Sequence, residues 1–119
     1  MKVRCIKLLD SRDQPTDRSG WAKIGGVYHV LAVWVEPAGS RFRMVGEEPT
    51  PVLFNSSMFE VISSTIPPSW VITSPKPGYL SFEPEAWSRD GFWENFYDKE
   101  PEAMAVFKAE RARIVESDP

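Results

Sequence analysis

His29 is the only residue of this 119-residue chain whose unperturbed pKa lies near neutrality, and Cys5 is its only thiol. Both stand in apolar patterns, because His29 alternates with Val27 and Leu31 and Cys5 alternates with Val3. Neither is flanked by a motif that places a nucleophile on a sharp turn or at a helix N-terminus. We therefore interpret both as core residues, and we predict no catalytic residue and no enzyme.

Metal and cofactor sites are not predicted either. One histidine and one cysteine are too few for a closed zinc site. Asp10, Asp13 and Asp17 share a proline-containing loop, but they lack the spacing of a calcium loop. Gly25-Gly26 precedes a strand pattern, whereas a phosphate-binding loop leads into a helix.

Candidate binding residues are concentrated in the second half of the chain. Residues 1–59 carry a net charge of +2 and residues 60–119 one of −5, which together give the −3 of the whole chain. The acids are densest in the segment 83–102, with aromatic residues among them. Carboxylates speed the encounter with a cationic partner, and tryptophan and tyrosine supply anchoring energy. The predicted partner-binding residues are Glu83, Glu85, Trp87, Asp90, Trp93, Glu94, Tyr97, Asp98, Glu100 and Glu102.

A structural interpretation of the same segment stays open. Trp87, Phe92, Trp93 and Phe96 also fit the apolar face of a helix that lies on a core. The acids would then be the solvated side of that helix.

Short strands are predicted for the first half of the chain. Val27–Val35 is rich in β-branched and aromatic residues and lies between glycine- and proline-containing turns, which is typical of a strand. Both of its faces are apolar, so we expect it to be covered on both sides. Further strands are expected at Val3–Leu9, Arg41–Val45 and Met58–Ile62. Because many short strands leave exposed edges in an open sheet, we predict a small, strongly bent antiparallel β-barrel.

Two α-helices are predicted at the end of the chain. Pro84 and Pro101 precede glutamates, and proline suits the first position of a helix. Asp90 is expected to cap a short helix that ends near Tyr97. An amphipathic helix is predicted for 101–116, with an inner face made of Met104, Phe107, Arg111, Ile114 and Val115.

The predicted fold class is therefore α+β in a single domain. Residues 1–63 form the β-barrel core, 64–82 an extended connection, and 83–119 a helical acidic extension packed on the barrel. Within the connection, 70–73 and 79–82 are expected to be extended.

Composition excludes several classes of protein. With 42% apolar residues and a net charge of −3, the chain is too apolar and too weakly charged for disorder. No stretch reaches the ~18 apolar residues of a membrane span. Lys2 and Arg4 stand where a signal peptide has its apolar block, and a lone cysteine makes no intramolecular disulfide. We expect a cytoplasmic protein with no membrane partner that is a monomer or a weak homodimer.

Three segments resemble the Src-homology-3-like barrels of small bacterial and phage proteins. These are Gly26–Leu31, Arg41–Gly46 and Met58–Ile62. In that resemblance a variable loop leads into a Gly-x-Tyr-x-Val strand, and a short polar turn precedes a final Phe-Glu-Val strand. The resemblance covers residues 1–63 and implies the fold rather than a function.

In overall character the chain resembles the immunity proteins of bacterial toxin systems, including contact-dependent growth inhibition. Those proteins bind and neutralise a cognate toxin domain, frequently a nuclease. The resemblance implies that the partner is a basic toxin domain whose active-site groove is covered.

Two other functions remain as alternatives. A small barrel that binds nucleic acid would use Arg4, Lys7, Arg41 and Arg43 beside aromatic residues, and a protein–protein adaptor is the related possibility. The net charge of −3 argues against direct contact with nucleic acid. An enzyme that uses His29 and surface carboxylates is the other alternative.

Overall fold

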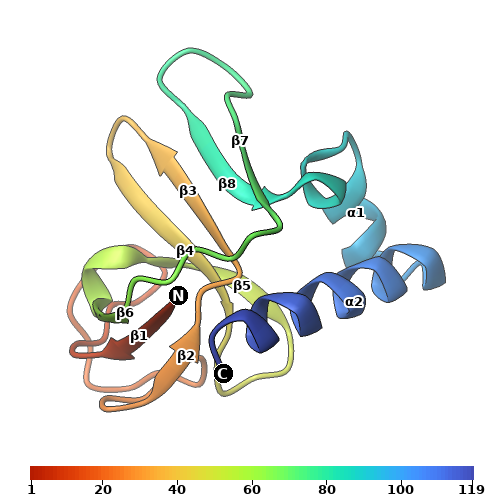
Figure 1. Ribbon diagram of the computed structural model, residues 1–119. Coiled ribbons are helices and arrows are strands. Elements are labelled where there is room, and N and C mark those ends of the chain that lie inside the picture. The colour runs from red at the N-terminus through yellow and green to blue at the C-terminus, as the bar shows by residue number, and fades with distance from the viewer.

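The computed structural model describes residues 1–119 and confirms an α+β fold, in which two antiparallel sheets are followed by two α-helices (Figure 1). One sheet has three strands in the order β2-β1-β6, and the other has five in the order β5-β4-β3-β8-β7. The strands are β1 (Lys2–Cys5), β2 (Val27–His29), β3 (Ala32–Glu36), β4 (Gly39–Val45), β5 (Pro51–Asn55), β6 (Phe59–Ser63), β7 (Trp70–Thr73) and β8 (Leu80–Pro84).

The first hydrophobic core lies between the two sheets. Phe59 on β6 is at its centre, because its ring makes edge-on contacts with Tyr28 and Phe54 and lies 6.3 Å from the ring of Phe42. A 3₁₀ turn, η1 (Ser56–Met58), leads directly into β6 and buries Met58. The buried members of this core are Val3, Cys5, Ala22, Tyr28, Val30, Phe42, Met44, Phe54, Met58 and Phe59.

The expected strand Val27–Val35 is in fact two strands that belong to different sheets. The chain leaves β2 after His29 and begins β3 at Ala32, so Val30 and Leu31 form the bend between the sheets. Val30 is buried in the first core, and Leu31 is buried in a second one. The apolar character of both faces therefore reflects two separate cores. The strands of the protein thus form two antiparallel sheets.

Two other strand predictions are corrected as well. β1 ends at Cys5 instead of Leu9, and β5 was not expected. The segments predicted to be extended at 70–73 and 79–82 do form strands, β7 and β8. They make a hairpin, in which β8 pairs with β3 through Val33 and Phe82, so the hairpin enlarges the five-stranded sheet.

The second core lies between the five-stranded sheet and the helices. A 3₁₀ turn, η2 (Glu85–Ser88), leads from β8 to α1 (Phe92–Tyr97), and α2 (Pro101–Ser117) follows. The core consists of Leu31, Trp87, Phe92, Ala103, Phe107 and Ile114. No helix of the protein combines the length and the apolar character that a membrane span requires.

Helix starts and helix faces were predicted only in part. Pro101 is the first residue of α2 as expected, but Pro84 is the last residue of β8. Asp90 does not cap α1. The residue before the helix is Gly91, whose backbone is in the left-handed conformation with φ of 78°. Glycine adopts that conformation without strain.

The inner face of α2 is rotated relative to the predicted one. Phe107 and Ile114 are buried as expected, and Ala103 joins them. Met104 is 43% exposed and Arg111 is exposed, so neither belongs to the core.

Replacing Ile114 by alanine removes a fully buried side chain from the second core. We expect the free energy of unfolding in urea to fall by about 3 kcal/mol, because the cavity that remains cannot be filled by its neighbours. Met104→Ala is the matched control on the same helix, with an expected change below about 0.5 kcal/mol. Equal losses in the two variants would contradict the assigned face of α2.

Candidate functional site

Five carboxylates around α1 are exposed and have no cation within ion-pairing distance. They are Asp90, Glu94, Asp98, Glu100 and Glu102. Glu85 is also exposed, but it pairs with Arg89 at 2.8 Å. Lys99 is the only basic residue in the segment 90–102, which contains all five. The structure therefore gathers most of the predicted acids on α1, the turns on either side of it and the first turn of α2. We call these five carboxylates the α1 acidic surface.

Two of the ten predicted partner-binding residues lie inside the protein. Glu83 on β8 is 8% exposed, and Trp87 in η2 is 1% exposed. The Trp87 ring stacks on Phe107 of α2, with 5.2 Å between the ring centroids. Neither side chain is available to a partner. The surface is thereby reduced to eight of the predicted residues.

The aromatic residues of the segment form one packed cluster. Phe96 lies 4.7 Å from Phe107 and 5.6 Å from Trp93 between ring centroids, so α1 and α2 are held together by their rings. Trp93 and Phe96 are half-buried, and Tyr97 is exposed on one side. The structural interpretation of the aromatic residues thus holds for Trp87 and Phe92, which are core. Of the aromatic residues predicted to bind a partner, Trp93 and Tyr97 still reach the surface.

Arg43 on β4 fixes α1 to the five-stranded sheet. Its guanidinium lies over the Trp93 ring, 3.7 Å from the centroid, and its Nη1 donates to Tyr97 Oη at 3.0 Å. Tyr97 Oη in turn donates to the carbonyl oxygen of Pro51 at 2.6 Å. Trp93 Nε1 donates to Glu83 Oε1 at 3.4 Å. We call Arg43, Glu83, Trp93 and Tyr97 the β4–α1 joint.

Burial sets the electrostatics of this joint. It raises the pKa of the Glu83 carboxyl, and the hydrogen bond from Ser81 and the charge of Arg43 oppose that rise. Burial also lowers the pKa of Arg43, which its polar neighbours partly restore. The two charges therefore stabilise each other in a site where either one alone is costly. The sequence placed Arg43 among surface cations and contained no signal of this role.

Two small clefts flank the turn that enters α1. One, of about 240 Å³, includes Asp90, Glu100 and Glu102 in its lining. The other, of about 270 Å³, lies between this turn and the face of β3 and β8, and its lining includes Asp90 and Glu94. The α1 acidic surface is thus hollowed on both sides of Asp90 rather than flat.

The four cations proposed for nucleic acid do not form a common surface. Arg4 pairs with Glu60 at 3.2 Å on the three-stranded sheet. Arg41 pairs with Asp13 at 2.8 Å on the other sheet, and Arg43 is held in the β4–α1 joint. Only Lys7 is exposed without an acidic partner.

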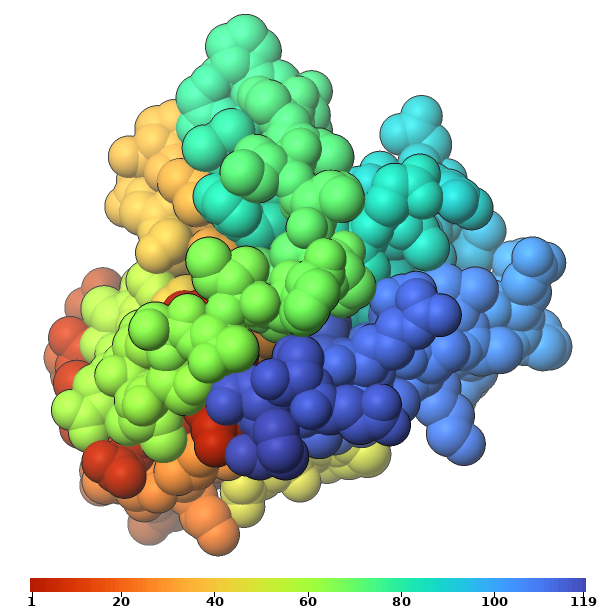
Figure 2. Space-filling view, in the orientation of Figure 1, coloured from red at the N-terminus to blue at the C-terminus, as the bar shows by residue number.

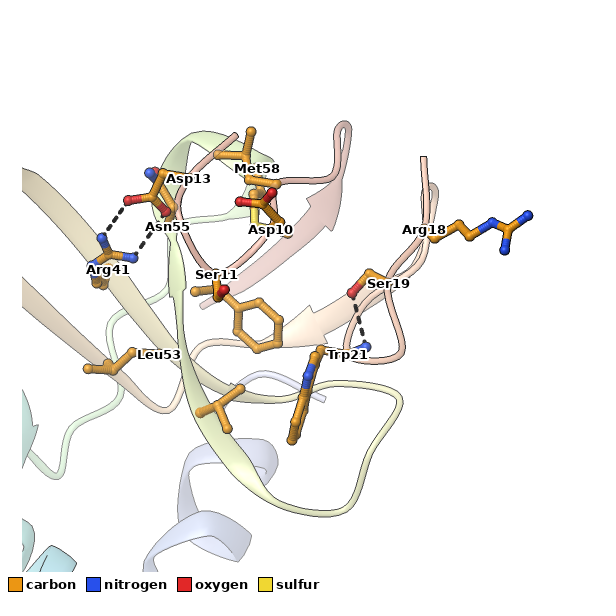
Figure 3. A pocket seen from close by; sticks show the side chains of 13 residues that line it. Asp10, Ser11, Asp13, Arg18, Ser19, Trp21, Arg41, Leu53, Asn55 and Met58 are labelled. Carbon is orange, nitrogen blue, oxygen red and sulfur yellow. Dashed lines mark hydrogen bonds and ion pairs between the residues drawn. The ribbon is translucent and has the colours of Figure 1, made fainter. Parts of the chain in front are cut away.

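A groove of about 500 Å³ lies between the loop that follows β1 and the strand β5. Figure 3 shows Trp21 on one side of β5 and Leu53 on the other, while Arg18 points away from the groove. Trp21 is 44% exposed. The rest of the apolar floor consists of Leu9, Val52, Phe54 and Met58.

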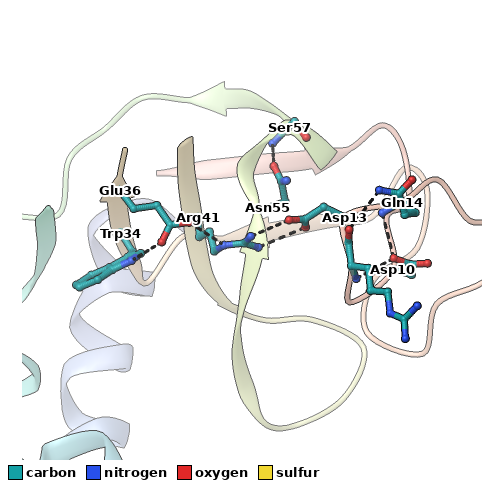
Figure 4. Close-up of polar contacts among 9 residues, drawn as sticks. Asp10, Asp13, Gln14, Trp34, Glu36, Arg41, Asn55 and Ser57 are labelled. Carbon is teal, nitrogen blue, oxygen red and sulfur yellow. Dashed lines mark hydrogen bonds and ion pairs between the residues drawn. The ribbon is translucent and has the colours of Figure 1, made fainter. Parts of the chain in front are cut away.

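One wall of the groove is fixed by a chain of polar contacts (Figure 4). Asp13 accepts from Arg41 Nη2, and Arg41 Nε lies 3.6 Å from Glu36 Oε1. That hydrogen bond from Arg41 keeps the pKa of Asp13 below its ordinary value. Asp10 accepts from the backbone N–H groups of Arg12 and Gln14, which closes the loop. The wall is therefore preformed.

The two residues with catalytic potential are both engaged in the fold. His29 Nε2 lies 2.7 Å from the carbonyl oxygen of Asp118, whose carboxylate pairs with the Met1 ammonium at 3.1 Å. Cys5 is buried, and burial raises the pKa of its thiol, which disfavours the reactive thiolate. The structure brings together no group of three His, Cys, Asp or Glu side chains with the geometry of a metal site.

Replacing Arg43 by methionine removes the charge that opposes the burial of Glu83. We expect a loss of about 3 kcal/mol in the free energy of unfolding at neutral pH, since the buried Glu83 carboxylate loses the nearby charge that favours its ionised form. The loss should grow as the pH rises from the ordinary carboxyl pKa of 4.5 through the raised pKa of Glu83. In this range the unfolded chain holds Glu83 ionised, whereas burial in the folded protein favours the protonated form, so folding becomes less favourable as the pH rises.

A second substitution, Glu83→Gln in the Arg43→Met background, should recover most of that stability and remove its pH dependence. Urea unfolding of the unmodified protein, both single variants and the double variant between about pH 5 and pH 8 measures both effects. If Arg43→Met unfolds like the unmodified protein at every pH, the β4–α1 joint does not hold the helix.

No family model, no curated protein and no solved structure matches this chain. The function of the protein is therefore inferred from the arrangement of its own side chains.

Proposed function

We propose that this protein is a non-enzymatic inhibitor that binds a cationic protein, in the manner of an immunity protein that neutralises a bacterial toxin. The observation that carries the proposal is the α1 acidic surface, whose five exposed carboxylates have no cation within ion-pairing distance. Like charges so close together repel one another, and a positively charged partner relieves that repulsion. The partner is therefore basic.

Rigidity supports the same function. Glu94 projects from α1, and the other four carboxylates project from the turns beside α1 and from the start of α2. The two helices pack together through aromatic rings, and Arg43 joins α1 to the sheet. Charges held on a rigid framework lose little side-chain and backbone entropy on binding, so more of the interaction energy appears as affinity. Trp93 and Tyr97 lie beside the carboxylates and supply apolar contact area.

The kind of partner is indicated by the charge it must carry. A groove that binds nucleic acid is lined with Lys and Arg, because it neutralises phosphates. A rigid surface of carboxylates opposes such a groove with complementary charge and blocks it sterically. A nuclease domain of a toxin is accordingly the partner we propose, and inhibition would result from occupation of its active-site groove.

We further propose that residues 1–63 are related to Src-homology-3-like barrels. The long loop between β1 and β2 and the 3₁₀ turn η1 directly before β6 support this relationship. The β7–β8 hairpin and the two helices would then be additions to that core.

A second function, that of a protein–protein adaptor, is favoured by the groove beside Trp21. Its apolar floor and its preformed polar wall suit an extended segment of another protein. The exposed indole of Trp21 would supply the main contact.

The triple variant E94K/D98K/E102K tests the leading proposal. We expect its affinity for a basic toxin domain that the unmodified protein binds to fall about 100-fold in calorimetric titration, because attraction becomes repulsion. The affinity of the unmodified protein should also decrease between low and moderate salt. The melting temperature should stay within about 2 °C, since all three side chains are exposed.

The matched control is D17K/E48K/E116K, which changes the net charge equally at exposed acids outside the α1 acidic surface. Its affinity should be reduced far less. If both triple variants bind as the unmodified protein does, the α1 acidic surface is not the interface.

Trp21→Ala separates the two functions. Under the leading proposal it leaves toxin binding unchanged, whereas an adaptor that uses the groove loses its partner when the indole is removed. Loss of binding in Trp21→Ala together with normal binding in E94K/D98K/E102K would replace the first function by the second.

A further inference from the structure

The strand β7 lies at the edge of the five-stranded sheet within an unusually uncharged stretch. No charged residue occurs between Glu60 and Lys76, although 26% of the chain is charged. This stretch is not buried, because Ile66, Val71 and Ile72 are all exposed. Ile72 is the most exposed residue of β7, at 67%. Figure 2 shows the β7–β8 hairpin at the top of the protein, separated by a notch from the helices.

The other three edge strands are each protected against pairing with a foreign strand. β6 carries Glu60, which pairs with Arg4 of β1. β5 begins at Pro51, and the loop after β1 lies beside it across the groove. β2 has only three residues. Charges, prolines and short length are the usual means by which edge strands avoid association.

Within β7 itself, Trp70-Val71-Ile72-Thr73, there is no charge and no proline. It pairs with β8 on one side only, so its other side presents backbone groups that no strand of this chain satisfies. Pro68 and Pro75 lie outside the strand and limit any added ladder to the residues between them.

We propose that β7 is a dimerisation strand, which pairs antiparallel with β7 of a second copy of this chain across a two-fold axis at Ile72. The two five-stranded sheets then form one continuous sheet. This inference is independent of the proposed function.

Electrostatics favours a second copy as the occupant. A two-fold interface brings each surface against itself, so any net charge in the patch is met by the same charge. Most of this acidic protein would therefore repel its own copy, whereas the stretch between Glu60 and Lys76 brings no like charges together. A basic partner, in contrast, gains nothing from an uncharged strand.

Sheet geometry fixes the register. Residues opposite each other in an antiparallel pair point to the same face of the sheet. Neighbouring residues of one strand point to opposite faces, so in a two-fold pair of β7 strands one residue must lie opposite the same residue of the other copy. An axis at Ile72 sets Ile72 against Ile72 of the partner subunit and Val71 against Thr73 of the partner subunit. The most exposed apolar side chain of the strand is then covered by its own copy.

The dimer should be weak. A strand of four residues contributes only a short ladder, and the buried area is below that of a permanent interface. We expect the mass measured by analytical ultracentrifugation to rise from monomer toward dimer between about 1 and 100 µM protein. Ile72→Lys should abolish this rise because two lysines then meet at the axis.

Val27→Lys is the control, since Val27 is an exposed apolar residue on the edge strand β2. It should dimerise as the unmodified protein does. Circular dichroism and thermal melting of both variants should match the unmodified protein, which separates loss of association from loss of the fold.

Cysteine cross-linking tests the register itself. Opposite residues of an antiparallel pair lie about 4.5–5.5 Å apart between Cα atoms, which is within the range of a disulfide. Ile72→Cys should therefore give a disulfide-linked dimer under mild oxidation, and Val27→Cys should not. A protein that is still monomeric at about 100 µM, or equal cross-linking of the two cysteine variants, would overturn the proposal.

Discussion

The packing of Arg43 on Trp93 is the interaction on which the arrangement of this protein depends. It joins β4, inside the five-stranded sheet, to α1, in the helical extension. Tyr97 completes the connection through its bonds to Arg43 and to the backbone of Pro51. A charge in this position is costly to bury, and the nearby Glu83 and the ring of Trp93 offset that cost. The helix α1, at the centre of the α1 acidic surface, is held in place as a result.

The sequence predicted the fold where local pattern decides structure. The start of α2 at Pro101 and the extended segments at 70–73 and 79–82 were all recognisable, because proline position and β-branched residues act locally. The division of Val27–Val35 between two sheets was not recognisable from the sequence. The bend at Val30 and Leu31 depends on two cores that form only in the folded protein. The pairing of β8 with β3 was not predictable either, because it joins segments that are far apart in the chain.

The candidate site was predictable in composition but not in detail. Charge density identified the region around α1, and five of its acids are indeed exposed and without an ion-pair partner. Glu83 and Trp87 are buried because β8 and η2 bring them beneath the helices, which no spacing in the sequence reveals. Arg41 and Arg43 lie on the same strand and look alike in the sequence. Arg41 pairs with Asp13, whereas Arg43 contacts Trp93 and Tyr97. The groove beside Trp21 required the loop after β1 to fold against β5, so it was not predicted at all.

The central claim is that the α1 acidic surface is where a partner binds. Hydrogen exchange of the complex with the proposed basic partner tests it most directly. The backbone amides of α1 and of the turns on either side of it should exchange more slowly in the complex than in the free protein. Amides of the loop between β1 and β2 should be unaffected. Protection confined to that loop and to β5, with α1 exchanging as in the free protein, would contradict this claim.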